Sequence, residues 1–137
     1  MKWTLEVVCV PVVDVDRARA FYAEGLGFVI DHDTTMGATS RIVQLTPPGS
    51  GCSICIGTGI VTMVPGSLQG LQLVVPDLRA AYTELVRRGV AISEVQVYDR
   101  EGLRPARNDD ALDNVGFCFF NDPDGNGWAV QQISARA

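Results

Sequence analysis

Apolar and polar positions follow two periods along this chain, and the same order of periods occurs twice. An apolar stretch at residues 10–13 runs into Asp14 and then into apolar residues at helical spacing. A weaker copy at residues 73–75 runs into Asp77, 63 residues after Asp14 in a chain of 137. Each copy is typical of a buried strand followed by an acidic N-cap and an amphipathic helix. Two such units usually share one site.

Both predicted helices end at glycines. The first runs from near Asp16 to Glu24 and is closed by Gly25 and Gly27. The second begins after the cap residue Asp77, and Gly89 closes it. The stripe that we expect to be buried comprises Ala18, Phe21, Tyr22 and Leu26 in the first helix and Leu78, Ala81, Tyr82, Leu85 and Val86 in the second.

Strand-like stretches follow each helix. They lie near residues 28–31, 41–45 and 53–57 in the first half and near 90–98, 115–120 and 127–134 in the second. The pattern therefore predicts one domain (1–137) of two β-α-β-β-β modules, module 1 (1–62) and module 2 (68–137), with a break in periodicity at Pro65 and Gly66. The polar segment 99–114 is predicted as a loop, either a lid or dimer contact or a solvated connection.

Composition excludes several classes of partner. The net charge is −5, the basic residues are scattered and the pI is about 4.7, which argues against binding to nucleic acid or to an anionic membrane surface. No apolar run reaches the roughly 18 residues that span a bilayer, and the start lacks the long apolar core of a signal peptide. We expect a cytoplasmic protein.

The cysteines carry one motif that resembles a metal or redox site. Cys52 and Cys55 have C-x-x-C spacing, but zinc needs a second pair of ligands and the single histidine, His32, lies in another segment. In a strand, residues three apart point to opposite faces. We therefore interpret all four cysteines, including Cys9 and Cys118, as reduced, small apolar residues.

Two motifs together resemble a known superfamily. One joins residues 12–14 and 20–22 to the Gly-Leu-Gly-Phe stretch at 25–28, and the other is Phe-Asn-Asp-Pro-Asp-Gly-Asn-Gly-Trp at 120–128. In this order they resemble the vicinal oxygen chelate superfamily of glyoxalases, extradiol dioxygenases and bleomycin-resistance proteins. The resemblance implies an α+β fold in which two tandem βαβββ modules form a cup-shaped, half-barrel mixed sheet. The turn at 122–126 is interpreted as structural, because Asp122 can bind its own downstream amides.

The resemblance also implies where a metal would bind. The ligand positions of metal-dependent relatives fall on Val7, Gly70 and Ala129, and near Cys55. Three of these residues have no donor atom, and one thiolate is not a metal site. His32 is expected far from all four positions. We therefore expect no metal and no other cofactor.

Strand alternation indicates what shares the inner face with those positions. Trp3, Leu5 and Cys9 lie with Val7, Gln72 and Val74 with Gly70, Gln131 with Ala129, and Ser53 with Cys55. The opposite face is apolar and is expected to pack against the helices. Such an inner face lacks acid-base pairs and suits an uncharged ligand with aromatic or amide character. The predicted ligand contacts are Val7, Cys9, Cys55, Gln72, Ala129, Gln131 and Arg104, and no catalytic residue is assigned.

Three functions remain open. The first is a non-catalytic binder of a small organic molecule, as in antibiotic-sequestering relatives with a dimer groove. The second is a metal-independent lyase, isomerase or cyclase that takes its acid or base from Arg104, Asp109, Asp110 or a cysteine. The third is a metal-dependent glyoxalase or dioxygenase with substituted ligands. The resemblance and the exposed sheet edges further imply a homodimer.

Overall fold

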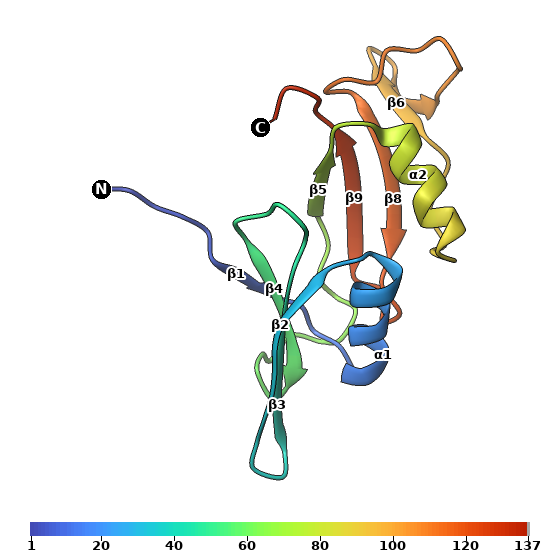
Figure 1. Ribbon diagram of the computed structural model, residues 1–137. Helices are drawn as coiled ribbons and strands as arrows, with labels where there is room; N and C mark the ends of the chain where they lie inside the picture. The colour runs from blue at the N-terminus through green and yellow to red at the C-terminus, as the bar shows by residue number, and fades with distance from the viewer. Residues whose placement is uncertain (137) are drawn as a thin grey trace. The chain divides into compact units, whose positions relative to one another are not determined.

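The computed structural model describes residues 1–136 (Figure 1). Contacts within the chain divide it into two compact units. Unit 1 comprises residues 1–68 together with 122–126, and unit 2 comprises residues 69–121 together with the chain from Gly127 onward. The turn at 122–126 thus packs with the first unit although it lies between two strands of the second. The sequence pattern alone does not indicate this.

Unit 1 has the predicted β-α-β-β-β order. Its elements are β1 (Val7–Cys9), α1 (Val15–Ala20) with a π-helical turn η1 (Phe21–Gly25), β2 (Val29–Met36), β3 (Ser40–Thr46) and β4 (Ser53–Thr58). The sheet order is β1-β4-β3-β2, with β1 parallel to β4 and the other pairs antiparallel. The first and last strands of the module are therefore neighbours.

Unit 2 repeats this topology with one additional strand. Its elements are β5 (Leu71–Val75), α2 (Leu78–Arg87), β6 (Gln96–Asp99), β7 (Gly102–Pro105), β8 (Gly116–Asn121) and β9 (Gly127–Gln132). The sheet order is β5-β9-β8-β6-β7, and β5 is parallel to β9. Again the first and last strands are neighbours, which confirms the internal repeat.

The predicted helix caps are confirmed in both units. The side chain of Asp14 accepts a hydrogen bond from the Arg17 amide, and that of Asp77 accepts one from the Ala80 amide, each at 3.1 Å. These bonds satisfy amides that have no partner within the first helical turn. Gly89 follows the second helix with a φ of 83°, a conformation in which a side chain would be strained.

Three predicted boundaries are wrong. The stretch predicted as a strand at 90–98 is mostly irregular, and only its end belongs to a strand, β6 (Gln96–Asp99). Ile92 makes just an isolated bridge to Phe120. The predicted loop at 99–114 contains β7, which pairs with β6 as a hairpin. The strand after the first helix extends to Met36 through polar residues, since pairing with β3 supplies the hydrogen bonds that local apolar periodicity does not announce.

Each unit has its own core on the helix side of its sheet. In Figure 1, α2 lies across the β5-β9-β8 sheet, and α1 contacts β4 in unit 1. Buried side chains include Val10, Ala18, Tyr22, Val43, Leu45 and Ile56 in unit 1 and Leu78, Val97, Cys118, Phe120, Trp128 and Val130 in unit 2. The apolar strand face predicted to pack against the helices is confirmed. Among residues 1–136, no helix has the length and apolar character needed to cross a membrane.

A buried carboxylate organises the turn at 122–126. Asp122 Oδ1 accepts hydrogen bonds from the amides of Asp124 and Asn126, both at 2.9 Å. Its Oδ2 accepts from the Tyr22 hydroxyl at 2.7 Å and from Asn126 Nδ2 at 2.8 Å. Three of these donors lie within the turn and set its shape, and the Tyr22 hydroxyl connects the turn to η1. The structural interpretation of these residues is confirmed.

Candidate functional site

The sheet of unit 2 has one face that its helix does not cover, and we call it the open face of unit 2. Leu78 of α2 approaches Gly116, which places α2 on the face of Cys118 and Val97. Residues that alternate with these point the other way. The strand residues of the open face are Gln72, Val74, Gln96, Tyr98, Leu103, Pro105, Phe117, Phe119, Asn121, Ala129 and Gln131. This set contains no charged side chain.

Three aromatic rings lie in the middle of the open face. The Phe117 and Phe119 rings stack with centroids 6.2 Å apart and an angle of 8°, and Tyr98 meets Phe117 edge-on at 6.5 Å. Phe119 is 37% exposed and Tyr98 is 57% exposed. Exposed aromatic rings provide flat apolar surface at a small cost in conformational entropy, so this group is suited to contact another ring.

Two amide side chains lie beside the aromatic rings. Gln72 Nε2 donates a hydrogen bond to Gln131 Oε1 at 2.5 Å, and Gln131 Nε2 donates to the Asn114 carbonyl at 2.8 Å. The predicted contacts Gln72, Ala129 and Gln131 therefore do share one face. They come together because β5 and β9 are paired in parallel, with Gln72 directly opposite Ala129.

A shallow pocket of about 280 Å³ opens where β5, β8 and β9 begin or end. Its lining includes three positions with little or no side chain, Gly70, Gly127 and Ala129. Its other lining residues are Gln69, Phe119, Phe120, Asn121 and Trp128. Small residues at the base and aromatic residues in the lining make an apolar recess with amide groups nearby, which is the usual composition of a ligand site.

The predicted contacts of unit 1 also share a face. Cys9 is paired with Cys55 across β1 and β4, and Val7 is paired with Ser53. The same row continues from Cys55 to Gln44 and from Gln44 to His32. The expectation that His32 lies far from these positions is therefore wrong in part, because His32 is on the same face, two strands from Cys55. Neither periodicity nor spacing could show this, since it depends on strand register.

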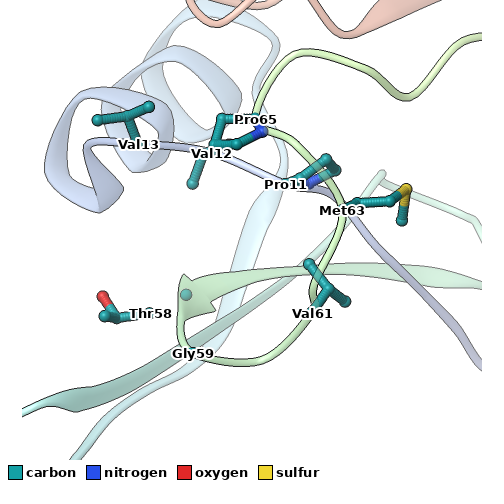
Figure 2. Close-up of a pocket in the computed structure, with 9 residues that line it drawn as sticks. Pro11, Val12, Val13, Thr58, Gly59, Val61, Met63 and Pro65 are labelled. Atoms are coloured by element: carbon teal, nitrogen blue, oxygen red, sulfur yellow. The ribbon is translucent and has the colours of Figure 1, made fainter.

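Unit 1 contains a second pocket that sequence reasoning did not indicate. It has a volume of about 220 Å³ and lies between residues 11–13 and the segment that follows β4. Figure 2 shows Pro11 and Val12 on one side and Val61, Met63 and Pro65 from the other segment. Its labelled side chains are apolar apart from Thr58, so it offers few side chains that could orient a ligand.

Arg104 does not share the open face with the other predicted contacts. It is paired with Val97, which is buried on the helix side, whereas its neighbours Leu103 and Pro105 lie on the open face. Its guanidinium makes ion pairs with Asp99 and Asp110, each at 2.8 Å. Hydrogen bonds to Arg104 hold the pKa of both carboxyls below its usual range. These ion pairs engage Arg104 and Asp110, two of the residues that were expected to supply an acid or base.

Burial disfavours the thiolate form of two cysteines, Cys55 and Cys118. Burial raises the pKa of Cys118 to about 11. Burial, with smaller contributions from Cys9, also raises the pKa of Cys55. A raised pKa lowers the thiolate fraction at neutral pH, and the thiolate is the nucleophile. All four cysteines are free, in agreement with the interpretation as small apolar residues.

Comparison with known proteins identifies the family. The family model described as "Glyoxalase/Bleomycin resistance protein/Dioxygenase superfamily" matches residues 4–130. The chain belongs to this superfamily. Its α+β fold of two mixed sheets with few helices is the glyoxalase/bleomycin-resistance fold. No curated protein matches the chain.

Solved structures of superfamily members match along nearly the whole chain. TnmS3, an antibiotic binding protein from Streptomyces sp. CB03234, is 31% identical with a TM-score of 0.74, over 97% of this chain and 98% of that one. A glyoxalase/bleomycin resistance protein from the same organism is 32% identical with a TM-score of 0.71, over 94% and 100%. A superfamily member from Sphaerobacter thermophilus DSM 20745 is 25% identical with a TM-score of 0.73, over 96% and 98%.

The positions at which superfamily enzymes hold a metal do not fit one in this member. Val7, Gly70 and Ala129 carry no donor, and Cys55 is paired with a single further thiol at Cys9. Within residues 1–136, no group of three or more His, Cys, Asp or Glu side chains could hold a metal ion. Catalytic zinc is held by three protein ligands, and these four positions offer only the Cys55 thiol with Cys9 beside it.

Sequence reasoning missed the aromatic residues of this superfamily member's open face. Phe117 and Phe119 alternate with Cys118 and Phe120 along β8, and this period was visible in the sequence. Which pair faces the open side was not, because it depends on the pairing of Phe119 with Ala129. The sequence therefore showed the alternation along β8 but not which of its residues lie on the open face.

Proposed function

We propose that this protein is a non-catalytic binder that sequesters a small, uncharged organic molecule with aromatic or amide character. The observation that carries the proposal is the open face of unit 2, where exposed Phe119 and Tyr98 adjoin the amides of Gln72 and Gln131. Apolar rings provide contact area and a few amides provide orientation, which is how ligand pockets achieve specificity. An uncharged face favours an uncharged ligand, since a buried charge without a partner is costly.

The name of one relative supports the same class of function. TnmS3 is described as an antibiotic binding protein, and it is 31% identical to this chain over 97% of its length. Sequestration of a toxic compound needs affinity and no chemical step. We propose that this chain acts in the same general way on its own ligand.

The acid-base and nucleophilic groups favour binding over catalysis. Asp110 is held by Arg104 and has a pKa below its usual range, which makes it a weak base. Cys55 and Cys118 have raised pKa values and are weak nucleophiles at neutral pH. A metal-independent enzyme would have to use groups outside this set.

We further propose a homodimer and a single functional domain of two modules. Both sheets have strands at open edges, β1 and β2 in unit 1 and β5 and β7 in unit 2, and open edges favour pairing with another chain. Trp3 is 82% exposed and Leu5 is 68% exposed, which leaves apolar surface to be covered. Val7, Cys9 and Cys55 remain proposed ligand contacts. Sedimentation at micromolar concentration tests the dimer, and a monomer would contradict it.

A pair of probes with one ring system tests the binding proposal. In equilibrium dialysis, 2-methoxynaphthalene should bind saturably, and the anionic 2-naphthalenesulfonate should bind at least tenfold more weakly. Phe119→Ser should weaken binding several-fold, since stacking area is lost. The control Val86→Ala, at an exposed position on α2, should not. Equal weak binding of both probes, or no effect of Phe119→Ser, would contradict the proposal.

A further inference from the structure

The amide chain on the open face has a fixed direction. The Asn114 carbonyl can only accept a hydrogen bond, so the Gln131 atom that faces it at 2.8 Å must be the donor Nε2. Gln131 therefore turns its acceptor, Oε1, toward Gln72. Gln72 must therefore donate through Nε2, which lies 2.5 Å from Gln131 Oε1. The Asn114 carbonyl thus fixes the orientation of the Gln131 amide, and the Gln131 amide fixes that of Gln72.

The Asn114 end of this series of amide hydrogen bonds is held by contacts with β9. Asn114 has a φ of 67°, in the left-handed region that asparagine tolerates better than most residues. Its amide donates a hydrogen bond to the Gln132 carbonyl at 2.8 Å. Gln132 in turn accepts a bond from the Leu78 amide at the start of α2. The backbone at Asn114 is therefore bound to the end of β9, and the end of β9 is bound to the start of α2.

The free end of the chain is an acceptor. With Nε2 of Gln72 bound to Gln131, Oε1 of Gln72 accepts no hydrogen bond from any residue within 1–136, and the side chain is exposed. Rotating the Gln72 amide would place two oxygens, its own and that of Gln131, against each other. That rotation is disfavoured, so Gln72 keeps Oε1 free to accept a hydrogen bond, and the second N–H of its Nε2 is the one donor that it has left.

The acceptor lies in one row with an aromatic ring. Gln72 is paired with Ala129, and Ala129 is paired with Phe119. Two strand spacings separate Gln72 from Phe119, about 10 Å, and only a methyl group stands between them. The recess of about 280 Å³ beside Ala129 has room for a small ring system. A ring that contacts Phe119 above Ala129 therefore directs its edge toward Gln72.

We propose that this row selects aromatic ligands that carry a hydrogen-bond donor, a phenolic hydroxyl or an aryl N–H, over the same rings that carry no donor. This inference rests on the binding function proposed above and names the chemical class of its ligand. Phe119 contacts the ring, Gln72 accepts the donor's hydrogen, and Gln131 is a positioning residue that acts through Gln72. Hydrogen-bond selection of this kind is effective because a mismatched polar pair is left unsatisfied.

The test compares three uncharged probes of one ring system, 2-naphthol, 2-methoxynaphthalene and naphthalene, by equilibrium dialysis at pH 7. The wild-type protein should bind 2-naphthol about tenfold more tightly than either other probe, the ratio expected for one partly buried hydrogen bond. Gln72→Leu should remove this preference and keep affinity for naphthalene. Gln131→Leu retains Gln72 but frees its amide to rotate, so the preference should fall to about threefold or less.

The outcomes separate the two proposals. If the probes bind equally and Phe119→Ser weakens all of them, the binding function stands and donor selection is refuted. If the naphthol preference survives in Gln72→Leu, or Gln131→Leu leaves it at its wild-type value, the assigned amide chain is refuted. If no probe binds saturably, both proposals fail. The Val86→Ala variant, on the helix side of the sheet, serves as the control for folding and surface effects.

Discussion

Replacing Tyr22 with phenylalanine tests the buried network that fixes the turn at 122–126. The Tyr22 ring is fully buried in η1 and its hydroxyl donates to Asp122 Oδ2 at 2.7 Å. The ring also stacks on Phe28, with centroids 5.8 Å apart, and meets Phe21 edge-on at 5.2 Å. Tyr22→Phe keeps these ring contacts and removes one oxygen atom. The substitution therefore isolates the hydrogen bond from the packing.

The size of the effect follows from the partners of Asp122. This carboxyl is 4% exposed and accepts four hydrogen bonds, so water cannot readily replace the lost one. A hydrogen bond to a charged group contributes about 1.5–3 kcal/mol to stability. No cavity of methyl size forms, so the cavity penalty is small. We expect Tyr22→Phe to lower the free energy of unfolding by about 2 kcal/mol.

Urea denaturation followed by circular dichroism and by tryptophan fluorescence measures this loss. The midpoint should fall with an unchanged m-value, provided that the two probes give coincident transitions. Tyr82→Phe, at a half-buried position on α2, is the matched control and should cost less than about 0.5 kcal/mol. If Tyr22→Phe costs no more than Tyr82→Phe, the three remaining donors satisfy Asp122 and the reasoning is refuted.

Three further predictions concern separate parts of the chain. The pKa of Cys118 is raised from 9.0 to about 11, so the folded state keeps a proton that the unfolded state loses. Stability should therefore be complete below pH 9 and fall by up to about 2.7 kcal/mol as the pH rises to 11, and Cys118→Ala should flatten this decline in pH-dependent denaturation. Gly57→Ala would place a Cβ 2.0 Å from the Arg41 carbonyl oxygen and should cost at least about 1–3 kcal/mol in thermal unfolding, whereas Gly51→Ala has open space and should cost little. Arg104→Leu should leave probe affinity within about twofold of wild type, and a tenfold loss would show that Arg104 does contact the ligand.

The parts of the fold that sequence predicted are those set by local rules. Asp14 and Asp77 cap their helices through amides three residues away. The apolar stripes pack as expected apart from Val86, which was predicted to be buried and is 50% exposed. The parts that it missed depend on partners distant in sequence. β7 exists because residues 102–105 pair with β6, and the polar half of β2 exists because it pairs with β3. No property of these segments alone distinguishes them from loops.

The candidate site was predictable to the same extent. The family resemblance put Gly70 and Ala129 on the inner face, strand alternation added Gln72 and Gln131, and the pairing of β5 with β9 brings Gln72, Ala129 and Gln131 together. Arg104 was assigned to a loop, and its pairing with Val97 instead puts it on the helix side. Phe119 was omitted, although it stands directly opposite Ala129 on β8. Alternation shows which residues of one strand share a face, and only the register between strands shows which residues of different strands do.

Two positions without a metal donor, Gly70 and Ala129, also line the recess of unit 2. The family resemblance implies that both residues stand at metal-ligand positions of superfamily enzymes. A histidine or glutamate at Ala129 would fill the space between Gln72 and Phe119 that a ring needs. In our proposal, the same small residues that carry no metal donor leave the volume that an organic ligand would occupy.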